Sequence, residues 1–276
     1  APFPIISYKQ AMLEFGSDKP DLRNPLRIID LTDFFQRCTF KPFHGKTVRA
    51  IKVHADMSKG FHEKLLKFAQ SIGMGGLGYL EVMEDKSYKG PIDKFIPDDM
   101  KEEIRETAGL EVGDTIFFIA DNEKNAALYA GQIRTALGER LDLIEKNSFK
   151  FCYINDFPMY EYDKETKKME FTHNPFSMPQ GGLEALETMD PEEILAYQYD
   201  IVCNGVELSS GAVRNHDMKI MVKAFEIAGY TEEDLKEKFG ALYNAFQFGA
   251  PPHAGMAPGV DRMIMLLTNE ENIREV

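Results

Sequence analysis

The sequence has few cysteines, and those present do not pair by spacing. Its 276 residues include three, at Cys38, Cys152 and Cys203, which lie far apart. An odd number at these distances excludes a disulfide framework, and none of the spacings is typical of a zinc site. Reduced, scattered cysteines indicate a reducing compartment, so we expect a cytoplasmic protein.

Long apolar runs and an excess of basic charge are also missing. No stretch reaches the roughly 20 apolar residues that cross a bilayer, and no signal peptide is evident. We therefore expect no membrane partner. The 32 Lys and Arg residues are outnumbered by 45 Asp and Glu, giving a net charge of −13. This balance argues against a broad nucleic-acid surface but leaves room for a local basic groove.

The length and texture of the chain predict an α+β protein with more than one domain. A chain of 276 residues, 43% hydrophobic, exceeds the usual single-domain size. The pattern of residues along the chain changes near residue 25 and again near residue 147. We therefore predict a first segment at 1–24, a separate domain at 25–147 and a second segment at 148–276.

The middle part, 25–147, has strand and helix patterns in irregular alternation, which predicts a small α+β domain. Strands are expected at 46–54, 76–83 and 115–120, and helices at 60–72 and from Pro97 to a stop at Gly109. A third helix is expected from Asn125 to Leu137, ending at Gly138. No cluster of catalytic side chains is visible in this part.

The stretch from Gly255 to Arg262 has the features of a ligand-binding strand and turn. Small residues alternate with apolar ones, which leaves one strand face bare, and an apolar helical run follows. A strand-to-helix junction presents free backbone N–H groups, and Arg262 could bind a phosphate through its forked donors. The alternative is a tight structural turn in which Arg262 forms an ion pair.

The stretch 199–214 predicts a hairpin that carries two acids. Asn204-Gly205 between apolar runs is the signal of a two-residue type I′ turn. The register that follows pairs Cys203 with Val206, Val202 with Glu207, Ile201 with Leu208 and Asp200 with Ser209. It places Asp200, Val202, Glu207 and Ser209 on one sheet face. Asp200 and Glu207 would then be diagonal neighbours, about 7–8 Å apart, close enough to hold Mg²⁺ between them. Alternatively, both acids face solvent on an edge hairpin.

Arg214 does not fall on this face if the side chains of the strand alternate strictly. It follows Glu207 by seven residues, so strict alternation would place the two side chains on opposite faces. We expect a β-bulge within Ser209-Ser210-Gly211 that returns Arg214 to the face of Glu207, where it could grip a carboxylate.

His173 is a weaker candidate. The following Asn174-Pro175 favours extended or turn geometry, so His173 is expected on a loop. A lone histidine on a loop usually has no chemical role, and that alternative stays open.

Several blocks resemble bacterial-type aspartyl-tRNA synthetases, which are class II aminoacyl-tRNA synthetases. Residues 255–262 resemble the third class II motif, G-Φ-G-Φ-G-Φ-x-R, with Ala257 for the middle glycine. Residues 199–214 resemble Y-D-x-V-x-N-G-x-E-[LVI]-[SG]-[SG]-G-[AS]-x-R. Residues 15–23 resemble Y-G-S-D-K-P-D-x-R, and 173–177 resemble the H-H-P-F-T/S flap. The middle part, most specifically 117–122, resembles the inserted GAD-type domain.

The resemblance implies a fold and a set of site residues. The fold would be the antiparallel sheet of the class II catalytic domain, flanked by helices and present in part, with a small α+β domain inserted. Asp200 and Glu207 would bind Mg²⁺ and ATP, and Arg214 and His173 would bind the aspartate substrate. The remaining ATP-binding residues would be Glu207, Gly259, Val260, Asp261 and Arg262. No covalent nucleophile is implied, so no catalytic residue is named.

The implied function is part of an aspartate–tRNA ligase. The whole enzyme would activate L-aspartate with ATP to aspartyl-adenylate and transfer it to tRNA(Asp), and charging of tRNA(Asn) stays open. It would act as a homodimer. The chain matches the C-terminal portion and both ends look cut. The first and second class II motifs are not in it, so we expect it to be inactive alone.

Three other interpretations compete with this one. One is a non-catalytic paralogue that keeps the fold. Another is the archaeal tRNA-dependent amidotransferase subunit that shares the inserted domain, but such a protein would not need the 255–262 motif or the carboxylate hairpin. The asparagine-specific branch is disfavoured because Arg214 suits an anionic side chain.

Overall fold

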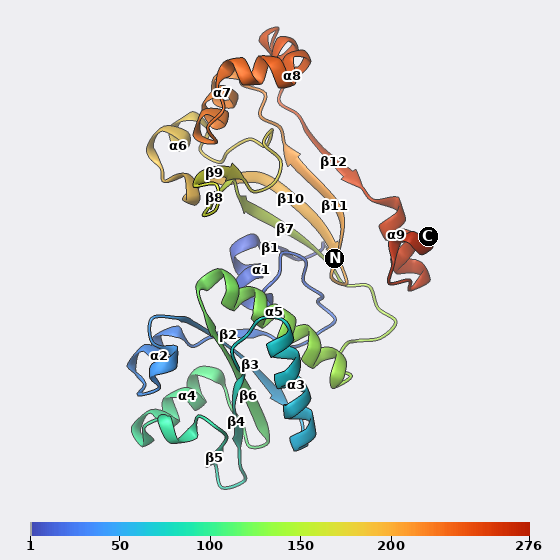
Figure 1. Ribbon diagram of the computed structural model, residues 1–276. Coiled ribbons are helices and arrows are strands. Elements are labelled where there is room, and N and C mark those ends of the chain that lie inside the picture. The colour runs from blue at the N-terminus through green and yellow to red at the C-terminus, as the bar shows by residue number, and fades with distance from the viewer. Residues whose placement is uncertain (1) are drawn as a thin grey trace. The chain divides into compact units, whose positions relative to one another are not determined.

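The computed structural model describes residues 2–276, and the chain divides into two compact units (Figure 1). One unit combines the N-terminal residues up to Lys9 with Phe151–Val276, and the other is Gln10–Lys150. The chain thus changes unit after Lys9 and after Lys150, whereas the texture of the sequence changes near 25 and 147. The assignment of 25–147 as an inserted domain stays a prediction.

The first unit contains a five-stranded sheet in the order β1-β7-β10-β11-β12. Its strands are β1 (Ile5–Ser7), β7 (Phe151–Pro158), β10 (Leu195–Cys203), β11 (Val206–Val213) and β12 (Ala254–Pro258). Every neighbouring pair is antiparallel except β1 and β7, which are parallel. The expected antiparallel sheet is therefore confirmed, with one parallel strand added at its edge.

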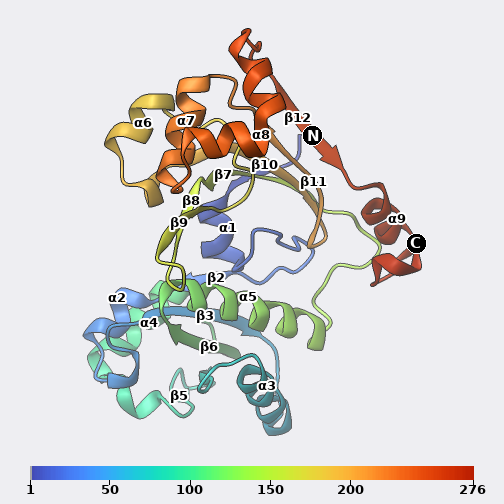
Figure 2. The same cartoon turned by 45° about the horizontal axis from the view of Figure 1, so that its top comes forward.

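Helices and a small hairpin pack beside this sheet. They are α6 (Gly182–Thr188), α7 (Met218–Ile227), α8 (Glu232–Gln247) and the hairpin β8 (Tyr160–Asp163) with β9 (Lys168–Phe171). Figure 2 shows α6, α7 and α8 grouped together. Thr231 caps α8 with Asp234 in a reciprocal capping box, which satisfies backbone donors at the helix start. The last helix, α9 (Val260–Thr268), follows β12.

The second unit contains an antiparallel sheet covered by helices on both faces. The strand order is β2-β3-β6-β4-β5. The strands are β2 (Ile28–Asp30), β3 (Thr47–His54), β4 (Gly78–Val82), β5 (Tyr88–Lys89) and β6 (Asp114–Asp121). The helices are α2 (Thr32–Arg37), α3 (Lys59–Ser71), α4 (Lys101–Ala108) and α5 (Glu123–Arg140), and α1 (Tyr8–Phe15) spans the boundary between the two units in sequence.

Strand β6 shows why its sequence is apolar throughout. Ile116 and Phe118 belong to the core cluster that includes residues of α2 and α4, whereas Phe117 and Ile119 belong to the cluster that includes residues of α3 and α5. Successive side chains of a strand point to opposite faces, so a strand buried on both faces loses the usual alternation.

One helix end was predicted incorrectly. Gly138 was expected to end the helix before it, but α5 continues to Arg140. Gly138 keeps a negative φ, and its missing side chain instead leaves room for Asn24, whose Nδ2 lies only 2.3 Å from where a Cβ would be. By contrast, Gly109 ends α4 in the left-handed conformation that its sequence position predicts. Short 3₁₀ helices occur at Lys41–Phe43, Asp93–Phe95, Asp98–Met100, Pro191–Glu193 and Ile273–Glu275.

A buried arginine holds the loop before β2 against α5. The Arg134 guanidinium donates to the carbonyl oxygens of Leu26 at 2.7 Å, Asn24 at 2.8 Å and Asp21 at 3.0 Å. Burial lowers the pKa of Arg134 to about 10, which leaves it charged at neutral pH. These charge-assisted bonds therefore fix the polar loop in place. No helix within residues 2–276 has both the length and the apolar character needed to span a bilayer.

Replacing Gly131 with alanine should destabilise the second unit. A Cβ at Gly131 would lie 2.4 Å from the Gly16 carbonyl oxygen, so α1 and α5 must separate. Alanine favours a helix by about 1 kcal/mol over glycine, but the overpacking should cost about 1–3 kcal/mol and outweigh it. Gly60→Ala, at an open position of α3, is the control and should stabilise. Urea unfolding curves of both variants measure the difference, and an unchanged Gly131→Ala midpoint would contradict the close approach.

The cysteine thiols should resist alkylation in the folded protein. Cys38, Cys152 and Cys203 are all buried. Burial, with a smaller contribution from Cys203, raises the pKa of the Cys152 thiol to about 12. The thiolate is the reactive form, so iodoacetamide should leave Cys152 unlabelled at pH 7.5 and at pH 9.5 unless urea is added. Mass spectrometry of labelled peptides measures this, and rapid native labelling at pH 9.5 would contradict it.

Candidate functional site

The predicted hairpin turn is present between β10 and β11. Asn204 has φ 53° and Gly205 has φ 84°, so both central residues adopt the positive φ that a type I′ turn requires. Next to the turn, Cys203 pairs with Val206 and Val202 with Glu207, as the sequence predicted.

Beyond Glu207 the predicted register is wrong by one residue. Ile201 pairs with Ser209 rather than Leu208, and Asp200 pairs with Ser210 rather than Ser209. The β-bulge therefore lies at Leu208 and not within 209–211. The side chain of this extra residue, Leu208, is buried. Ser209 consequently lies on the face opposite to Asp200, which corrects the predicted grouping of the two.

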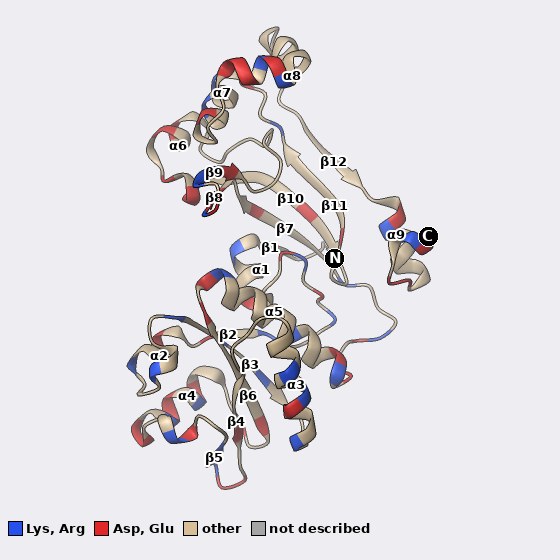
Figure 3. Ribbon diagram, in the orientation of Figure 1, with Lys and Arg blue, Asp and Glu red and all other residues tan. Residues whose placement is uncertain are grey.

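The bulge nevertheless resolves the parity of Arg214. One extra residue after Glu207 shifts the alternation, so Arg214 lies on the same face as Glu207 and Asp200. Asp200 is almost fully buried and Glu207 is half-buried. Figure 3 shows acidic segments within β10 and at the start of β11, near the turn. The sheet thus presents two acids and one arginine on a single face.

The junction between β12 and α9 is bonded directly to the bulge. The Gly259 amide donates to the Leu208 carbonyl oxygen at 2.7 Å. The Arg262 Nη1 donates to the Glu207 carbonyl oxygen at 2.8 Å and lies 3.2 Å from the Glu207 carboxylate. The structural ion pair considered as an alternative is therefore present. This ion pair uses one nitrogen of a guanidinium that has five N–H donors, so the other donors of Arg262 can still bind a phosphate.

The backbone of Arg214 is held by hydrogen bonds, whereas its side chain has no bonding partner among residues 2–276. Its amide donates to the His253 carbonyl oxygen at 2.9 Å, and an isolated bridge joins it to Ser177. Its guanidinium makes no hydrogen bond or ion pair with any residue in 2–276. A half-buried guanidinium without a protein partner can accept a carboxylate in bidentate geometry.

The two faces of the sheet differ sharply at β11 and β12. On the face of Arg214, a Cβ at Gly255 would meet nothing within 4 Å. On the opposite face, a Cβ at Gly211 would lie 2.5 Å from Cε2 of Tyr199. The Tyr199 hydroxyl also donates to the Gly255 carbonyl oxygen at 3.3 Å. Tyr199 therefore packs against the back of the strand whose front is bare, a role that the sequence analysis missed.

The other predicted site residues lie at the surface. His173 follows β9, is exposed, and contacts the Phe157 ring of β7 edge-to-face at 4.9 Å between centroids. Val260 and Asp261 are exposed in the first turn of α9. Its ring contact places His173 beside β7, which belongs to the same sheet as the strands next to the two arginines.

The two acids could hold a metal ion only with help from a ligand. No group of three His, Cys, Asp or Glu side chains with metal-binding geometry exists among residues 2–276. Magnesium commonly binds one or two carboxylates and completes its shell with water and phosphate oxygens. The donor set of Asp200 and Glu207 fits that pattern.

Comparison with known proteins identifies the family to which the chain belongs. A family model described as tRNA synthetases class II (D, K and N) matches residues 1–276. The chain belongs to this family of class II tRNA synthetases.

The curated relatives of this synthetase chain have closely similar sequences. Aspartate–tRNA(Asp/Asn) ligases from Ehrlichia ruminantium (strain Gardel) and Rickettsia africae are 54% identical over 281 residues and 52% identical over 286 residues. These alignments cover 99% and 100% of this chain but 48% of each relative. The chain therefore spans about half the length of the relatives it matches. A solved aspartyl-tRNA synthetase from Entamoeba histolytica aligns at 19% identity with a TM-score of 0.35, covering 84% of this chain and 42% of that one.

Two glycines of the synthetase sheet should respond differently to alanine. Gly211→Ala should destabilise the first unit by about 1–3 kcal/mol, because its Cβ would overlap Tyr199 and the Gly255 carbonyl. Gly255→Ala should leave stability within about 0.5–1 kcal/mol of the original, because the space beside it is open. Denaturant unfolding followed by circular dichroism compares them. Equal effects would mean that the two faces do not differ as described.

Proposed function

We propose that this chain carries part of the active site of an aspartate–tRNA ligase. The observation that supports this most is the joining of the two motif blocks at the Leu208 bulge. There Arg262 and Gly259 are bonded to β11, and Arg214 lies on the same face as Glu207. Two acids, two arginines and a bare strand suit a ligand that combines a nucleotide with a small dicarboxylate.

Arg214 binds the side-chain carboxylate of L-aspartate. Its fork of donors matches two carboxylate oxygens, and an asparagine amide would place an N–H group against one of these donors. His173 approaches the amino acid from its loop. The arginine therefore selects aspartate over asparagine, since a buried donor left without an acceptor costs about 1–3 kcal/mol.

ATP binds beside β12 and the start of α9. Arg262 contacts the γ-phosphate with the donors that Glu207 does not use, and the amides of Gly259, Val260 and Asp261 add the positive end of the helix. Asp200 and Glu207 hold Mg²⁺, which neutralises phosphate charge when it is bound. The bare face at Gly255 and Ala257 lets the adenine ring lie against the strand.

The reaction needs no protein nucleophile. An α-carboxylate oxygen of aspartate attacks the α-phosphorus of ATP, pyrophosphate leaves, and aspartyl-adenylate forms. A ribose hydroxyl at the tRNA 3′ end then attacks the carbonyl carbon, and AMP leaves. The residues of this chain orient the reactants and offset charge, which are the main sources of rate in such transfers.

The transfer to tRNA is proposed for a longer protein, because the chain spans about half the length of its curated relatives. The names of these aspartate–tRNA(Asp/Asn) ligases support tRNA(Asp) and tRNA(Asn) as its substrates. We propose a homodimer acting in the cytoplasm, and little activity from this chain alone.

Calorimetric titration with a non-hydrolysable aspartyl-adenylate analogue tests the site. Binding should be stronger with Mg²⁺ than without it. Arg214→Gln should weaken binding of the adenylate analogue, and Arg262→Gln should weaken binding of a non-hydrolysable ATP analogue. Each loss should be about 10- to 150-fold, because a hydrogen bond to a charged group contributes about 1.5–3 kcal/mol. Arg274→Gln, an exposed position outside the site, is the matched control and should bind like the original chain.

Specificity supplies a second readout. Arg214→Gln should lose most of its preference for the aspartyl over the asparaginyl analogue, whereas Arg262→Gln should keep it. If the folded chain bound neither analogue, it would be a non-catalytic relative or would lack too much of the site. If both variants bound like the original, the assigned roles would be wrong.

A further inference from the structure

The unit Gln10–Lys150 contains a cavity that the proposed ligase site does not use. Its volume is about 1170 Å³, and it is bordered by the loop 73–77 that leads into β4. We call it the glycine-loop cavity. Five of its lining residues are half-buried aromatics: Phe40, Phe43, Tyr79, Phe95 and Tyr129. A concave cavity of this size with several aromatic walls can enclose a small organic ligand.

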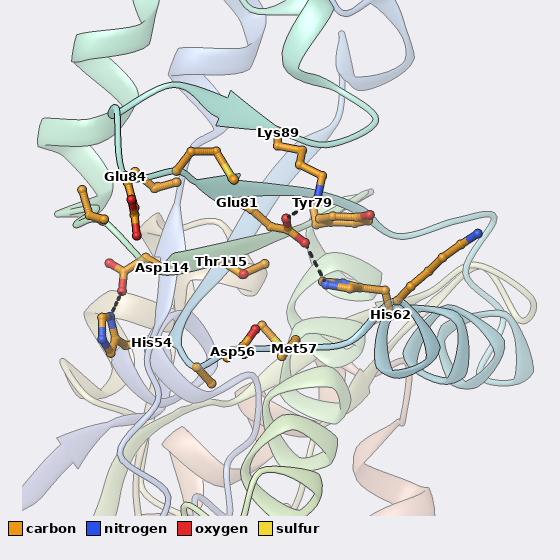
Figure 4. Close-up of a pocket in the computed structure, with 16 residues that line it drawn as sticks. His54, Asp56, Met57, His62, Tyr79, Glu81, Glu84, Lys89, Asp114 and Thr115 are labelled. Carbon is orange, nitrogen blue, oxygen red and sulfur yellow. Dashed lines mark hydrogen bonds and ion pairs between the residues drawn. The ribbon is translucent and has the colours of Figure 1, made fainter.

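One wall of the cavity is a stacked pair of rings. His62 of α3 and Tyr79 of β4 lie with their centroids 4.2 Å apart and their planes 16° from parallel. Figure 4 shows these two rings face to face, with Glu81 and Lys89 beside them. The same pair borders a second hollow of about 740 Å³. Aromatic walls of this kind stack readily with planar heterocycles.

His62 carries an unsatisfied polar group at this wall. Its side chain is only 8% exposed, and Nε2 lies 3.1 Å from the Glu81 carboxylate. Both ring nitrogens are buried, and neither Nδ1 nor Nε2 makes a well-aligned hydrogen bond with any residue in 2–276, so the contact of Nε2 with Glu81 is one of charge and distance alone. Such an atom costs about 1–3 kcal/mol if nothing pairs with it, so the wall favours a ligand that can form a hydrogen bond.

The rim of the cavity provides donors for an anion. The backbone amides of Gly75 and Gly76 donate to no residue in the described range 2–276. A Cβ at either position would meet nothing within 4 Å, so a ligand can approach the backbone closely. The Lys46 ammonium group likewise has no acceptor or acidic partner within that range. Exposed consecutive amides that share a cavity lining with a lysine are suited to a phosphate group.

The other lysines of the lining are already paired. Lys59 lies 3.9 Å from Glu63, and Lys89 lies 3.4 Å from Glu81. The Asp121 carboxylate accepts the Asn122 amide at 2.8 Å, a neutral donor that leaves its negative charge in place. Lys46 is therefore the lysine of the lining that has no acidic partner within residues 2–276.

We propose that the glycine-loop cavity binds a mononucleotide. The base lies against Tyr79 and hydrogen-bonds to His62, and the phosphate lies at the amides of Gly75 and Gly76 with Lys46. An apolar ligand would leave His62 Nδ1 unpaired, and an inorganic anion would leave the aromatic lining empty. A nucleotide matches both parts of the cavity.

Hydrogen exchange of the whole chain with AMP tests this and locates the binding. AMP should slow amide exchange in peptides covering 59–79, and adenosine or inorganic phosphate alone should need at least tenfold higher concentration for the same effect. Binding at the proposed ligase site would instead protect 206–262, so failure of one site is distinguishable from failure of the other.

Two variants and one control accompany the measurement. Gly76→Phe fills open space and should raise the AMP concentration needed for half-maximal protection of 59–79 at least tenfold. Lys46→Glu should do the same by repelling the phosphate. Gly60→Phe, on α3 but outside the lining, should match the original chain. Absence of protection in 59–79 at millimolar AMP, or full protection in both Gly76→Phe and Lys46→Glu, would overturn the proposal.

Discussion

The first unit depends on the hydrogen bonds that two consecutive carbonyl groups accept at the Leu208 bulge. The bulge interrupts the ladder between β10 and β11, and the bond from Gly259 to Leu208 continues the ladder between β11 and β12. Here the Glu207 oxygen accepts from Arg262 and the Leu208 oxygen accepts from Gly259. The bulge at Leu208 determines the face on which Arg214 lies. It is hydrogen-bonded to the junction of β12 and α9, which positions Arg262. One backbone feature therefore places both arginines.

The same sheet separates packing from binding by face. Tyr199 covers Gly211 on the back, where a side chain would clash, and the front at Gly255 stays open. Small residues thus serve two purposes on adjacent strands: Gly211 admits a ring from its own sheet, and Gly255 leaves space for a ligand ring. The contact of Tyr199 with Gly211 and Gly255 supports the strand from behind, and rigid support is what a site that orients reactants requires.

Local signals in the sequence predicted much of this arrangement. The turn at Asn204-Gly205 was predictable because few residue pairs tolerate two positive φ angles. A bulge was predictable from the parity of Arg214, but its position was not, because alternation alone does not say which residue is extra. Leu208 takes that position since its side chain is buried. The cavity in the second unit was not predictable, because its lining comes from segments far apart in the sequence.

The most direct test is a crystal structure of the chain with Mg²⁺ and a non-hydrolysable aspartyl-adenylate analogue. The account predicts that the aspartyl carboxylate pairs with Arg214, that the metal lies between the phosphate and the carboxylates of Asp200 and Glu207, and that the adenine lies along β12. A ligand bound on the opposite face of the sheet, or one that leaves Arg214 without contact, would contradict it.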